Sequence, residues 1–268
     1  MVSIKFALIE GAKRLQNIAE RARYEAEILM SFFAGLSRVE LITKEDRLID
    51  ENGFFALIAK RETGYPIEYI TKSAGFYSRD FFCEEGVLIP RPETELLVDR
   101  VVELASDFGD GNLTIAEIGV GGGAIAVTLA ILLKNISIVA TDINKKAIEI
   151  AKINADRYGV KDRIEFINTN LLDGVNKNID ILVSNPPYIE QGYDLPKNVS
   201  YEPENALFGG EGGIDILKEI IELKQAVIAC ECGYNQEGVL RSILVENGYK
   251  QIAFYKDYAN LTRGFTAR

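Results

Sequence analysis

From Leu113 onward, short apolar runs alternate with stretches that have helical periodicity. Strands are predicted at Leu113–Ile118, Ser137–Asp142, Ile164–Ile167, Ile179–Ser184, Ala226–Glu231 and Gln251–Tyr255. Helices are predicted between them at Ile125–Leu133, Lys145–Tyr158, Ile214–Leu223 and Gln236–Asn247. This alternation favours an α/β fold with a mostly parallel, doubly wound sheet, in which ligands bind at the carboxyl ends of the strands.

The first third of the chain has a helical pattern instead. Apolar residues recur every three or four positions and predict one face of a helix that stops at Gly35. The stripe consists of Leu15, Ile18, Ala22, Ala26, Leu29 and Phe33. Further short helices are expected around Lys44–Leu48 and Phe54–Glu62, so residues 1–72 are expected to form a small helical domain.

Residues 73–95 are expected to link the two parts. Short apolar runs at Phe76-Tyr77, Phe81-Phe82 and Val87–Ile89 suggest a hairpin-like stretch. The segment Pro90–Glu95 then predicts an extended turn that leads into a helix over Leu96–Ala105. Residues 96–268 are expected to form the second domain.

A glycine-rich loop follows the first strand of the second domain. Its glycines at 119, 121 and 123 permit a tight turn and allow a ligand to lie against the backbone before the next helix begins. A dinucleotide fingerprint has its third glycine at the position of Ala124, where alanine is also tolerated, so a nicotinamide cofactor stays open. A plain strand-to-helix turn is the structural alternative.

Asp142 lies at the end of the next strand and can accept hydrogen bonds from both hydroxyls of a ribose. It could equally cap the helix that follows. Asn170 and Leu171, just past the third strand, lie where an adenine ring would be flanked. Together with the glycine loop, these residues favour an adenosyl ligand over the first three strands.

The fourth strand ends in Asn185-Pro186-Pro187-Tyr188. The prolines hold the chain extended, so the Asn185 side chain and nearby carbonyl groups face the space above the strand end. These oxygens can accept hydrogen bonds from both hydrogens of an NH2 group, and Tyr188 can cover a planar group. A proline-rich strand exit with a capping asparagine is the alternative.

Composition limits the chemistry. The chain contains no histidine, which excludes histidine-based triads and histidine metal sites. Residues 1–72 balance 11 basic against 11 acidic residues, so the net charge of −10 lies in the remainder and disfavours nucleic-acid binding. The three cysteines have no zinc-type spacing, and no membrane or targeting segment is evident, so a cytoplasmic protein is expected.

Methyl transfer from S-adenosylmethionine to a nitrogen held beside Asn185 fits these features, because proximity and alignment supply most of the catalysis. The chain also resembles the HemK/PrmC-type protein-glutamine methyltransferases, which act on peptide-chain release factors. The resemblance spans nearly the whole chain. Its motifs include Gly64–Ile70, Val87–Glu95, Asn185–Tyr188, Tyr201-Glu202-Pro203, Ala206–Gly210, Gly213–Asp215, Glu231–Gln236 and Lys256-Asp257.

The resemblance implies a helical domain (residues 1–72) that recognises the release factor, and a seven-stranded methyltransferase domain with a terminal antiparallel strand. The target is the amide nitrogen of the glutamine in a Gly-Gly-Gln loop. Asn185, Pro186, Pro187 and Tyr188 would be catalytic and would bind the substrate together with Arg91 and Glu93. The cofactor would contact Gly119, Val120, Gly121, Gly122, Gly123, Asp142, Asn170, Leu171 and Asn185. No metal is expected, and the enzyme is expected to be a monomer.

Three features depart from the family. Val120-Gly121-Gly122 stands where the cofactor loop often contains a small hydroxyl residue. Asn170 replaces an acidic residue near the adenine, and Lys72 replaces a glycine, which we interpret as a surface change. Three alternatives remain: an adenine-N6 methyltransferase acting on DNA or RNA, a non-catalytic adaptor that binds cofactor or release factor, and a nicotinamide dehydrogenase.

Overall fold

A computed structural model describes residues 1–109 and 111–268 of the chain. It separates into two compact units. The first unit contains Met1–Ser73 and Leu195–Tyr201, and the second contains Ala74–Asp194 and Glu202–Arg268. The segment Leu195–Tyr201 therefore packs with the first unit, although it lies within the range 96–268 expected for the second domain.

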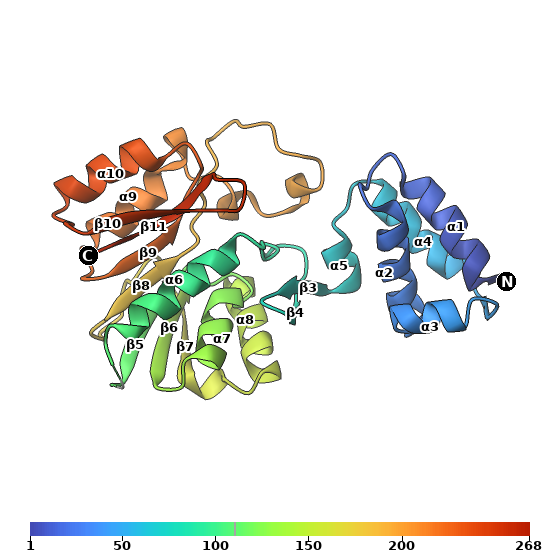
Figure 1. The fold of residues 1–268 in the computed structure, drawn as a ribbon, viewed down its shortest axis with the longest axis horizontal. Coiled ribbons are helices and arrows are strands. Elements are labelled where there is room, and N and C mark those ends of the chain that lie inside the picture. The colour runs from blue at the N-terminus through green and yellow to red at the C-terminus, as the bar shows by residue number, and fades with distance from the viewer. Residues whose placement is uncertain (110) are drawn as a thin grey trace. The chain divides into compact units, whose positions relative to one another are not determined.

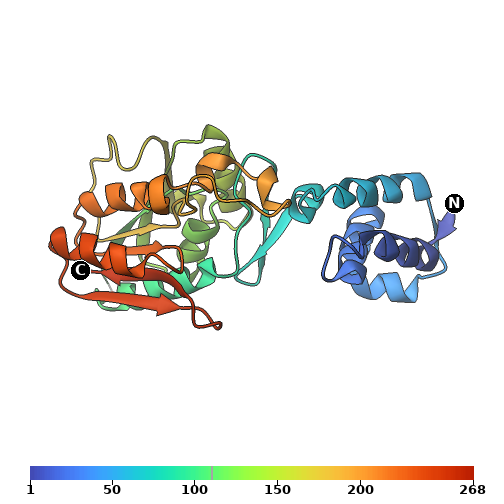
Figure 2. The same cartoon turned by 90° about the horizontal axis from the view of Figure 1, so that it is seen from above.

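The first unit is mainly helical (Figure 2). Its elements are β1 (Val2–Ser3), α1 (Ile4–Leu15), α2 (Ala22–Ala34), α3 (Arg38–Thr43), β2 (Leu48–Ile49), α4 (Glu51–Glu62) and α5 (Ile67–Thr71). A core that includes Leu15, Leu29, Met30 and Phe54, all fully buried, joins the helices. The segment Leu195–Tyr201 joins this unit through Tyr201, whose ring meets that of Tyr65 edge-on with centroids 5.2 Å apart.

The prediction of one continuous helical stripe from Leu15 to Phe33 is wrong. A turn over residues 16–21 separates α1 from α2, and these two helices pack on each other. Ile18, which the stripe placed on the buried face, is 37% exposed in this turn. Gly35 does end α2, and its φ of +64° is the left-handed conformation that glycine adopts readily.

The predicted helix at Lys44–Leu48 is also absent from the described structure. A capping box between Ser37 and Glu40 begins α3 earlier, at Arg38, and the helix ends at Thr43. The predicted helix at Phe54–Glu62 is correct but starts three residues earlier, because the Asp50 side chain accepts a hydrogen bond from the Asn52 backbone N–H.

Lys72 caps the end of α5 with a φ of +58°. A lysine adopts this left-handed conformation less readily than glycine does. Lys72 is exposed, as expected for a surface position. This backbone conformation is one that glycine would adopt more readily.

The second unit is built on a seven-stranded sheet in the order β10-β11-β9-β8-β5-β6-β7 (Figure 1). Its strands are β5 (Leu113–Ile118), β6 (Ile136–Asp142), β7 (Ile164–Asn168), β8 (Ile181–Ser184), β9 (Ile228–Glu231), β10 (Ile252–Lys256) and β11 (Thr262–Ala267). The neighbouring strands β9, β8, β5, β6 and β7 are parallel to one another. In contrast, β11 is antiparallel to both of its neighbours, β10 and β9. The predicted fold class is confirmed.

Helices cover both faces of this sheet. One face packs against α6 (Thr94–Ser106), α7 (Ala124–Leu132) and α8 (Lys145–Arg157). The other face packs against α9 (Asp215–Glu222) and α10 (Glu237–Glu246). Each predicted helix and strand of this unit lies within three residues of its observed bounds. Among the strands of the seven-stranded sheet in the described residues, β11 was not located from periodicity. None of the helices in the described residues has the length and apolarity needed to cross a membrane.

A hairpin precedes the sheet. It is formed by β3 (Ser73–Phe76) and β4 (Arg79–Phe82), and Tyr77 and Ser78 at its turn both have positive φ. The apolar run Val87–Ile89, which was expected to belong to the hairpin-like stretch, forms no strand. Instead, the Ile89 backbone N–H donates to the Glu202 carboxylate at 2.9 Å.

Burial within the sheet leads to a stability prediction. Ile115 on β5 is fully buried, whereas Ile153 on α8 is 47% exposed. We expect Ile115→Ala to lower the free energy of unfolding by about 2–5 kcal/mol, because it opens a cavity that the surroundings fill only partly. Ile153→Ala, the matched control, should change it by about 0.5 kcal/mol or less. Urea denaturation measures both, and equal losses would contradict the core assignment.

Candidate active site

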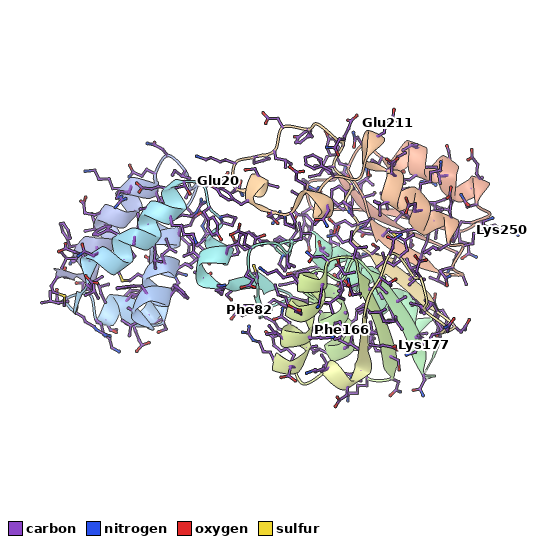
Figure 3. The ribbon with its side chains drawn as sticks, turned by 180° about the vertical axis from the view of Figure 1, so that it is seen from behind. Glu20, Phe82, Phe166, Lys177, Glu211 and Lys250 are labelled. Carbon is purple, nitrogen blue, oxygen red and sulfur yellow. The ribbon has the colours of Figure 1, made fainter. Side chains whose placement is uncertain are left out.

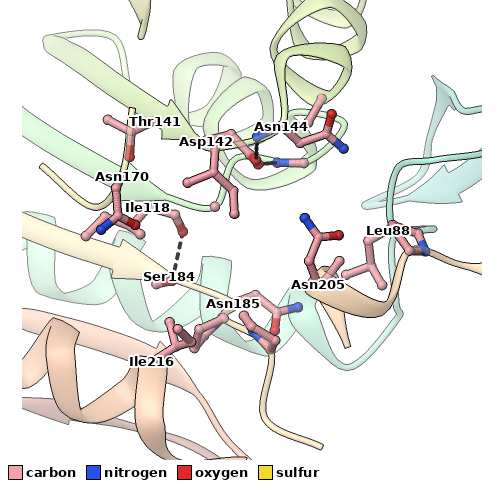
Figure 4. Close-up of a pocket in the computed structure, with 18 of the residues that line it drawn as sticks. Leu88, Ile118, Thr141, Asp142, Asn144, Asn170, Ser184, Asn185, Asn205 and Ile216 are labelled. Atoms are coloured by element: carbon pink, nitrogen blue, oxygen red, sulfur yellow. Dashed lines mark hydrogen bonds between the residues drawn. The ribbon is translucent and has the colours of Figure 1, made fainter. Parts of the chain in front are cut away.

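A pocket opens at the carboxyl-terminal edge of the parallel strands (Figure 4). Segments that follow β5, β6, β7 and β8 line it, and the loop before α6 and residues 203–206 complete it. The lining includes Leu88, Gly119, Gly121, Asp142, Asn170, Leu171, Asn185, Pro186, Pro187 and Asn205. The pocket therefore lies where the strand order reverses next to β5, as expected for a doubly wound sheet.

The glycine loop forms one wall. Gly119 and Gly121 have φ values of +74° and +52°, and a Cβ atom on either would meet nothing within 4 Å. Both glycines line the pocket, so their missing side chains leave room for a ligand against the backbone. The backbone N–H groups of Gly119 and Val120 both donate to the Thr141 carbonyl at 2.9 Å, which fixes the loop to β6.

The other predicted loop residues shape this wall without lining the pocket. Val120 is buried in the core beneath the loop. Gly123 allows α7 to approach α8, because a Cβ atom there would lie 3.1 Å from Ala151. Gly122 accepts a hydrogen bond from the Asn154 side chain at 2.8 Å.

Asn154 holds the loop from behind, and sequence analysis missed it. Its Oδ1 accepts from the Phe82 backbone N–H at 2.7 Å, and its Nδ2 donates to the carbonyl groups of Phe82 and Gly122. Phe82, labelled in Figure 3, ends β4. A fully buried asparagine on the apolar face of α8 was the available signal, because buried amides require hydrogen-bond partners.

Asp142 connects the glycine loop to the start of α8. One carboxylate oxygen accepts from the Gly121 backbone N–H at 2.9 Å, and the other accepts from the Asn144 backbone N–H at 2.8 Å. Burial raises the pKa of Asp142 above its usual 3.8, and these two hydrogen bonds oppose the shift. Each oxygen keeps a further lone pair that can accept a hydroxyl. Asn170 and Leu171 lie in the same pocket.

Ser184 and Asn185 mark the end of β8. The Ser184 hydroxyl donates to the Ile118 carbonyl at 2.8 Å, which joins β8 to β5 at the edge of the pocket (Figure 4). Asn185 is half-buried, and its Nδ2 donates to Thr94 Oγ1 at 3.0 Å. Pro186 and Pro187 continue the lining of the pocket.

Tyr188 does not line this pocket. Its ring packs against the core under α9 and α10, and its hydroxyl donates to Glu231 Oε1 at 2.8 Å. Burial raises the pKa of the Tyr188 hydroxyl, and the nearby Glu231 carboxylate adds to the shift. Thr94 and Glu231 belong to sequence motifs noted above, but sequence analysis assigned neither of them a role.

Arg91 and Glu93 also lie outside the pocket lining. Arg91 forms an ion pair with Glu202, a carboxylate that is almost fully buried. Glu202 also accepts from Ile89, so this pair anchors the loop before α6. The Arg91 side chain, predicted to bind substrate, therefore contacts Glu202 and does not line the pocket.

Glu117 is a buried carboxylate beneath the glycine loop and is 1% exposed. It accepts a hydrogen bond from the Ala126 backbone N–H, but its Oε2 has no partner among the described residues. Burial raises the pKa of Glu117 well above 4.5, and the charge of Asp142 adds to the shift. A neutral amide at this position would avoid the cost of the buried charge.

This arrangement predicts a pH-dependent effect of Glu117→Gln. Because the folded-state pKa exceeds the unfolded value of 4.5, the wild type loses stability as pH rises from there through the folded-state pKa. One linked proton corresponds to about 1.4 kcal/mol per pH unit in that window. We expect Glu117→Gln to match the wild type near pH 4.5 and to be progressively more stable above it.

Urea denaturation across the pH range measures this difference. Glu149→Gln, on the exposed side of α8, is the matched surface control. A Glu117→Gln variant that gains nothing as pH rises would show that this carboxyl group carries no burial penalty.

Comparison with known proteins is consistent with this geometry. Residues 7–71 match the family model described as PrmC N-terminal domain, and residues 92–202 match the one described as Methyltransferase small domain. The release factor glutamine methyltransferase of Clostridium acetobutylicum is 34% identical over 98% of this chain and 97% of its own length. The enzyme of the same name from Bacillus cereus is 40% identical over 76% of this chain and 75% of its length.

Solved structures agree on the fold alone. The hMettl16 catalytic domain in complex with MAT2A 3′UTR hairpin 1 aligns with a TM-score of 0.56 at 16% identity, over 93% of this chain and 94% of that chain. A ribosomal protein L11 methylase from Lactobacillus delbrueckii subsp. bulgaricus aligns with a TM-score of 0.50 at 21% identity, over 69% and 82% of the two chains. The sequence relatives are closer, and through them the chain belongs to the release factor glutamine methyltransferase family.

Proposed function

We propose that this enzyme transfers a methyl group from S-adenosylmethionine to the side-chain amide nitrogen of the glutamine in the Gly-Gly-Gln loop of peptide-chain release factors. One observation carries the proposal. The Asn185-Pro186-Pro187 exit of β8 lines the same pocket as the glycine loop and Asp142. A cofactor wall and a site for an amide group therefore face one space.

The residues of the pocket fit S-adenosylmethionine. Gly119 and Gly121 leave open backbone where a ligand can lie, and Asp142 keeps acceptor capacity for the ribose hydroxyls. Asn170 and Leu171 would flank the adenine. When bound, the cofactor supplies an electrophilic methyl group on a sulfonium, which departs as a neutral thioether.

The protein's contribution is to hold the glutamine amide that receives the methyl group. An amide nitrogen is a poor nucleophile, because its lone pair is delocalised into the carbonyl group. The Asn185 side-chain oxygen and the Pro186 carbonyl would accept its two N–H groups and orient the nitrogen. The nitrogen would accept the methyl group and release one proton to solvent. Alignment of the two reactants supplies most of the rate enhancement.

The first unit is the proposed release-factor recognition domain. It carries large apolar side chains exposed on two of its helices, Phe6 and Ile9 on α1 and Val39 and Ile42 on α3. Their exposed fractions run from 50% to 75%, so these residues offer apolar contact area to a protein partner. The net charge of −10 disfavours a nucleic-acid substrate, and we propose that the enzyme acts as a monomer.

Asp142→Ala tests the cofactor assignment. Removing a charged acceptor of the ribose hydroxyls should weaken S-adenosylmethionine binding about 10- to 100-fold, since hydrogen bonds to charged groups contribute about 1.5–3 kcal/mol. Isothermal titration calorimetry measures the affinity. Asp156→Ala, at an exposed carboxylate of α8, is the matched control and should leave it unchanged. An unaltered affinity in Asp142→Ala would rule out the ribose contact.

Methyl transfer from labelled S-adenosylmethionine tests the reaction itself. Unmodified release factor, its Gln→Ala loop variant and duplex DNA are offered in parallel. We expect label on the intact release factor only. Label on DNA would instead favour adenine methylation, and bound cofactor without transfer would favour a non-catalytic adaptor.

The same assay tests Asn185. We expect Asn185→Ala to reduce transfer by about 100-fold or more, because an oriented acceptor for the substrate N–H groups is lost. Cofactor affinity should be nearly unchanged. Asn178→Ala, at an exposed asparagine, is the control. Equal loss of transfer and cofactor binding in Asn185→Ala would show that the amide serves the cofactor instead.

A further inference from the structure

Three hydrogen bonds join four side chains behind the pocket. Asn185 Nδ2 donates to Thr94 Oγ1 at 3.0 Å, and Thr94 Oγ1 donates to Glu231 Oε2 at 2.7 Å. From the other side, the Tyr188 hydroxyl donates to Glu231 Oε1 at 2.8 Å. Thr94 is 4% exposed and Glu231 is 1% exposed, so water competes little for these bonds.

Three distant parts of the chain meet here. The parallel pairing of β8 with β9 places Ser184 opposite Cys230, so the next residues, Asn185 and Glu231, lie at the same end of the two strands. Thr94 comes from the first turn of α6, which packs against both strands. Neither Thr94 nor Glu231 lines the pocket. Thr94 contacts the lining residue Asn185, and Glu231 is linked to it through Thr94.

Only one orientation of the Asn185 amide is compatible with these hydrogen bonds when Glu231 is ionised. An ionised carboxylate only accepts hydrogen bonds, and a threonine hydroxyl has a single hydrogen. With that hydrogen donated to Glu231, Thr94 can only accept from Asn185. The Asn185 NH2 group must therefore face Thr94, which turns its carbonyl oxygen away from Thr94. Without Glu231, the hydroxyl could equally donate to the Asn185 oxygen, and both amide orientations would be possible.

This choice matters for transfer to an amide nitrogen. The substrate amide presents N–H groups, which need the Asn185 oxygen as their hydrogen-bond acceptor. A reversed Asn185 amide would instead point its own N–H groups at them. Resting on the proposed function, we infer that Thr94 and Glu231 are positioning residues that fix which end of the Asn185 amide meets the substrate. Tyr188 completes the arrangement by satisfying the second oxygen of Glu231.

The charge state of Glu231 depends on several neighbours. Burial raises the pKa of Glu231, and Glu93 at the start of α6 adds to the shift. The hydrogen bonds from Thr94 and Tyr188 and the charge of Arg263 on β11 favour the ionised form. Tyr255 on β10 and Cys232, which follows β9, also face this carboxylate. Protonation of Glu231 on Oε2 would let this oxygen donate to Thr94 and would free the Thr94 hydrogen, so acidification should reduce kcat in the wild type.

Substitutions in the full-length enzyme test the inference. Thr94→Val keeps the shape of the side chain and removes the hydroxyl, Thr94→Ser keeps the hydroxyl, and Glu231→Gln replaces an acceptor with a donor. Thr128→Val is the matched control, because the buried Thr128 hydroxyl has no partner in the described structure. Two quantities are measured: kcat at saturating S-adenosylmethionine and release factor, and the side-chain amide NMR signal of Asn185, assigned by its loss in Asn185→Asp.

We expect Thr94→Val and Glu231→Gln to lower kcat by about 10-fold or more, as for other lost orienting hydrogen bonds. Both should shift the Asn185 amide signal and leave cofactor affinity unchanged. Thr94→Ser and Thr128→Val should resemble the wild type, and the fall of kcat at acidic pH should be missing in Glu231→Gln.

An Asn185 amide NMR signal that does not shift in Thr94→Val would overturn the inference. A Thr94→Val enzyme with wild-type kcat would do the same. The NMR result decides the arrangement of the amide even if the wild type methylates no release factor. That failure would count against the proposed function instead.

Discussion

Parallel pairing of β5 with its two neighbours is the constraint on which the rest of the site depends. The register places Ile118 opposite Thr141 of β6 on one side and opposite Ser184 of β8 on the other. The residues that follow these three positions are Gly119, Asp142 and Asn185. The wall proposed for the cofactor and the site proposed for the amide acceptor thus become neighbours, because three strands end at one level.

Buried polar groups stabilise this edge at a cost. Glu117, Asp142 and Glu231 are carboxyl groups whose pKa values are all raised by burial. Asp142 and Glu231 have hydrogen-bond donors on both oxygens, which offset part of that cost. A core of apolar residues would be easier to stabilise, but it could not orient polar ligands.

The structure divides roles within the Asn-Pro-Pro-Tyr motif. Asn185, Pro186 and Pro187 line the pocket, whereas Tyr188 turns into the protein and donates to Glu231. One motif therefore supplies both part of the pocket lining and a contact behind it. Because the two prolines keep the backbone extended, the side chains of Asn185 and Tyr188 can point in different directions although both belong to the same four residues.

The sequence by itself determined the strands and helices of the second unit, the glycine loop, Asp142 and the exit of β8. Each of these depends on local patterns, such as apolar periodicity, positive-φ glycines or proline stiffness, and so can be read from neighbouring residues. Local periodicity failed at the turn over residues 16–21, because the spacing of Leu15, Ile18 and Ala22 continues across a break between two helices. Only the tertiary structure decided the partners of Asn154, Glu202 and Thr94. Thr94 and Glu231 are 137 positions apart, and such a bond depends on how the packed sheet brings distant backbone together.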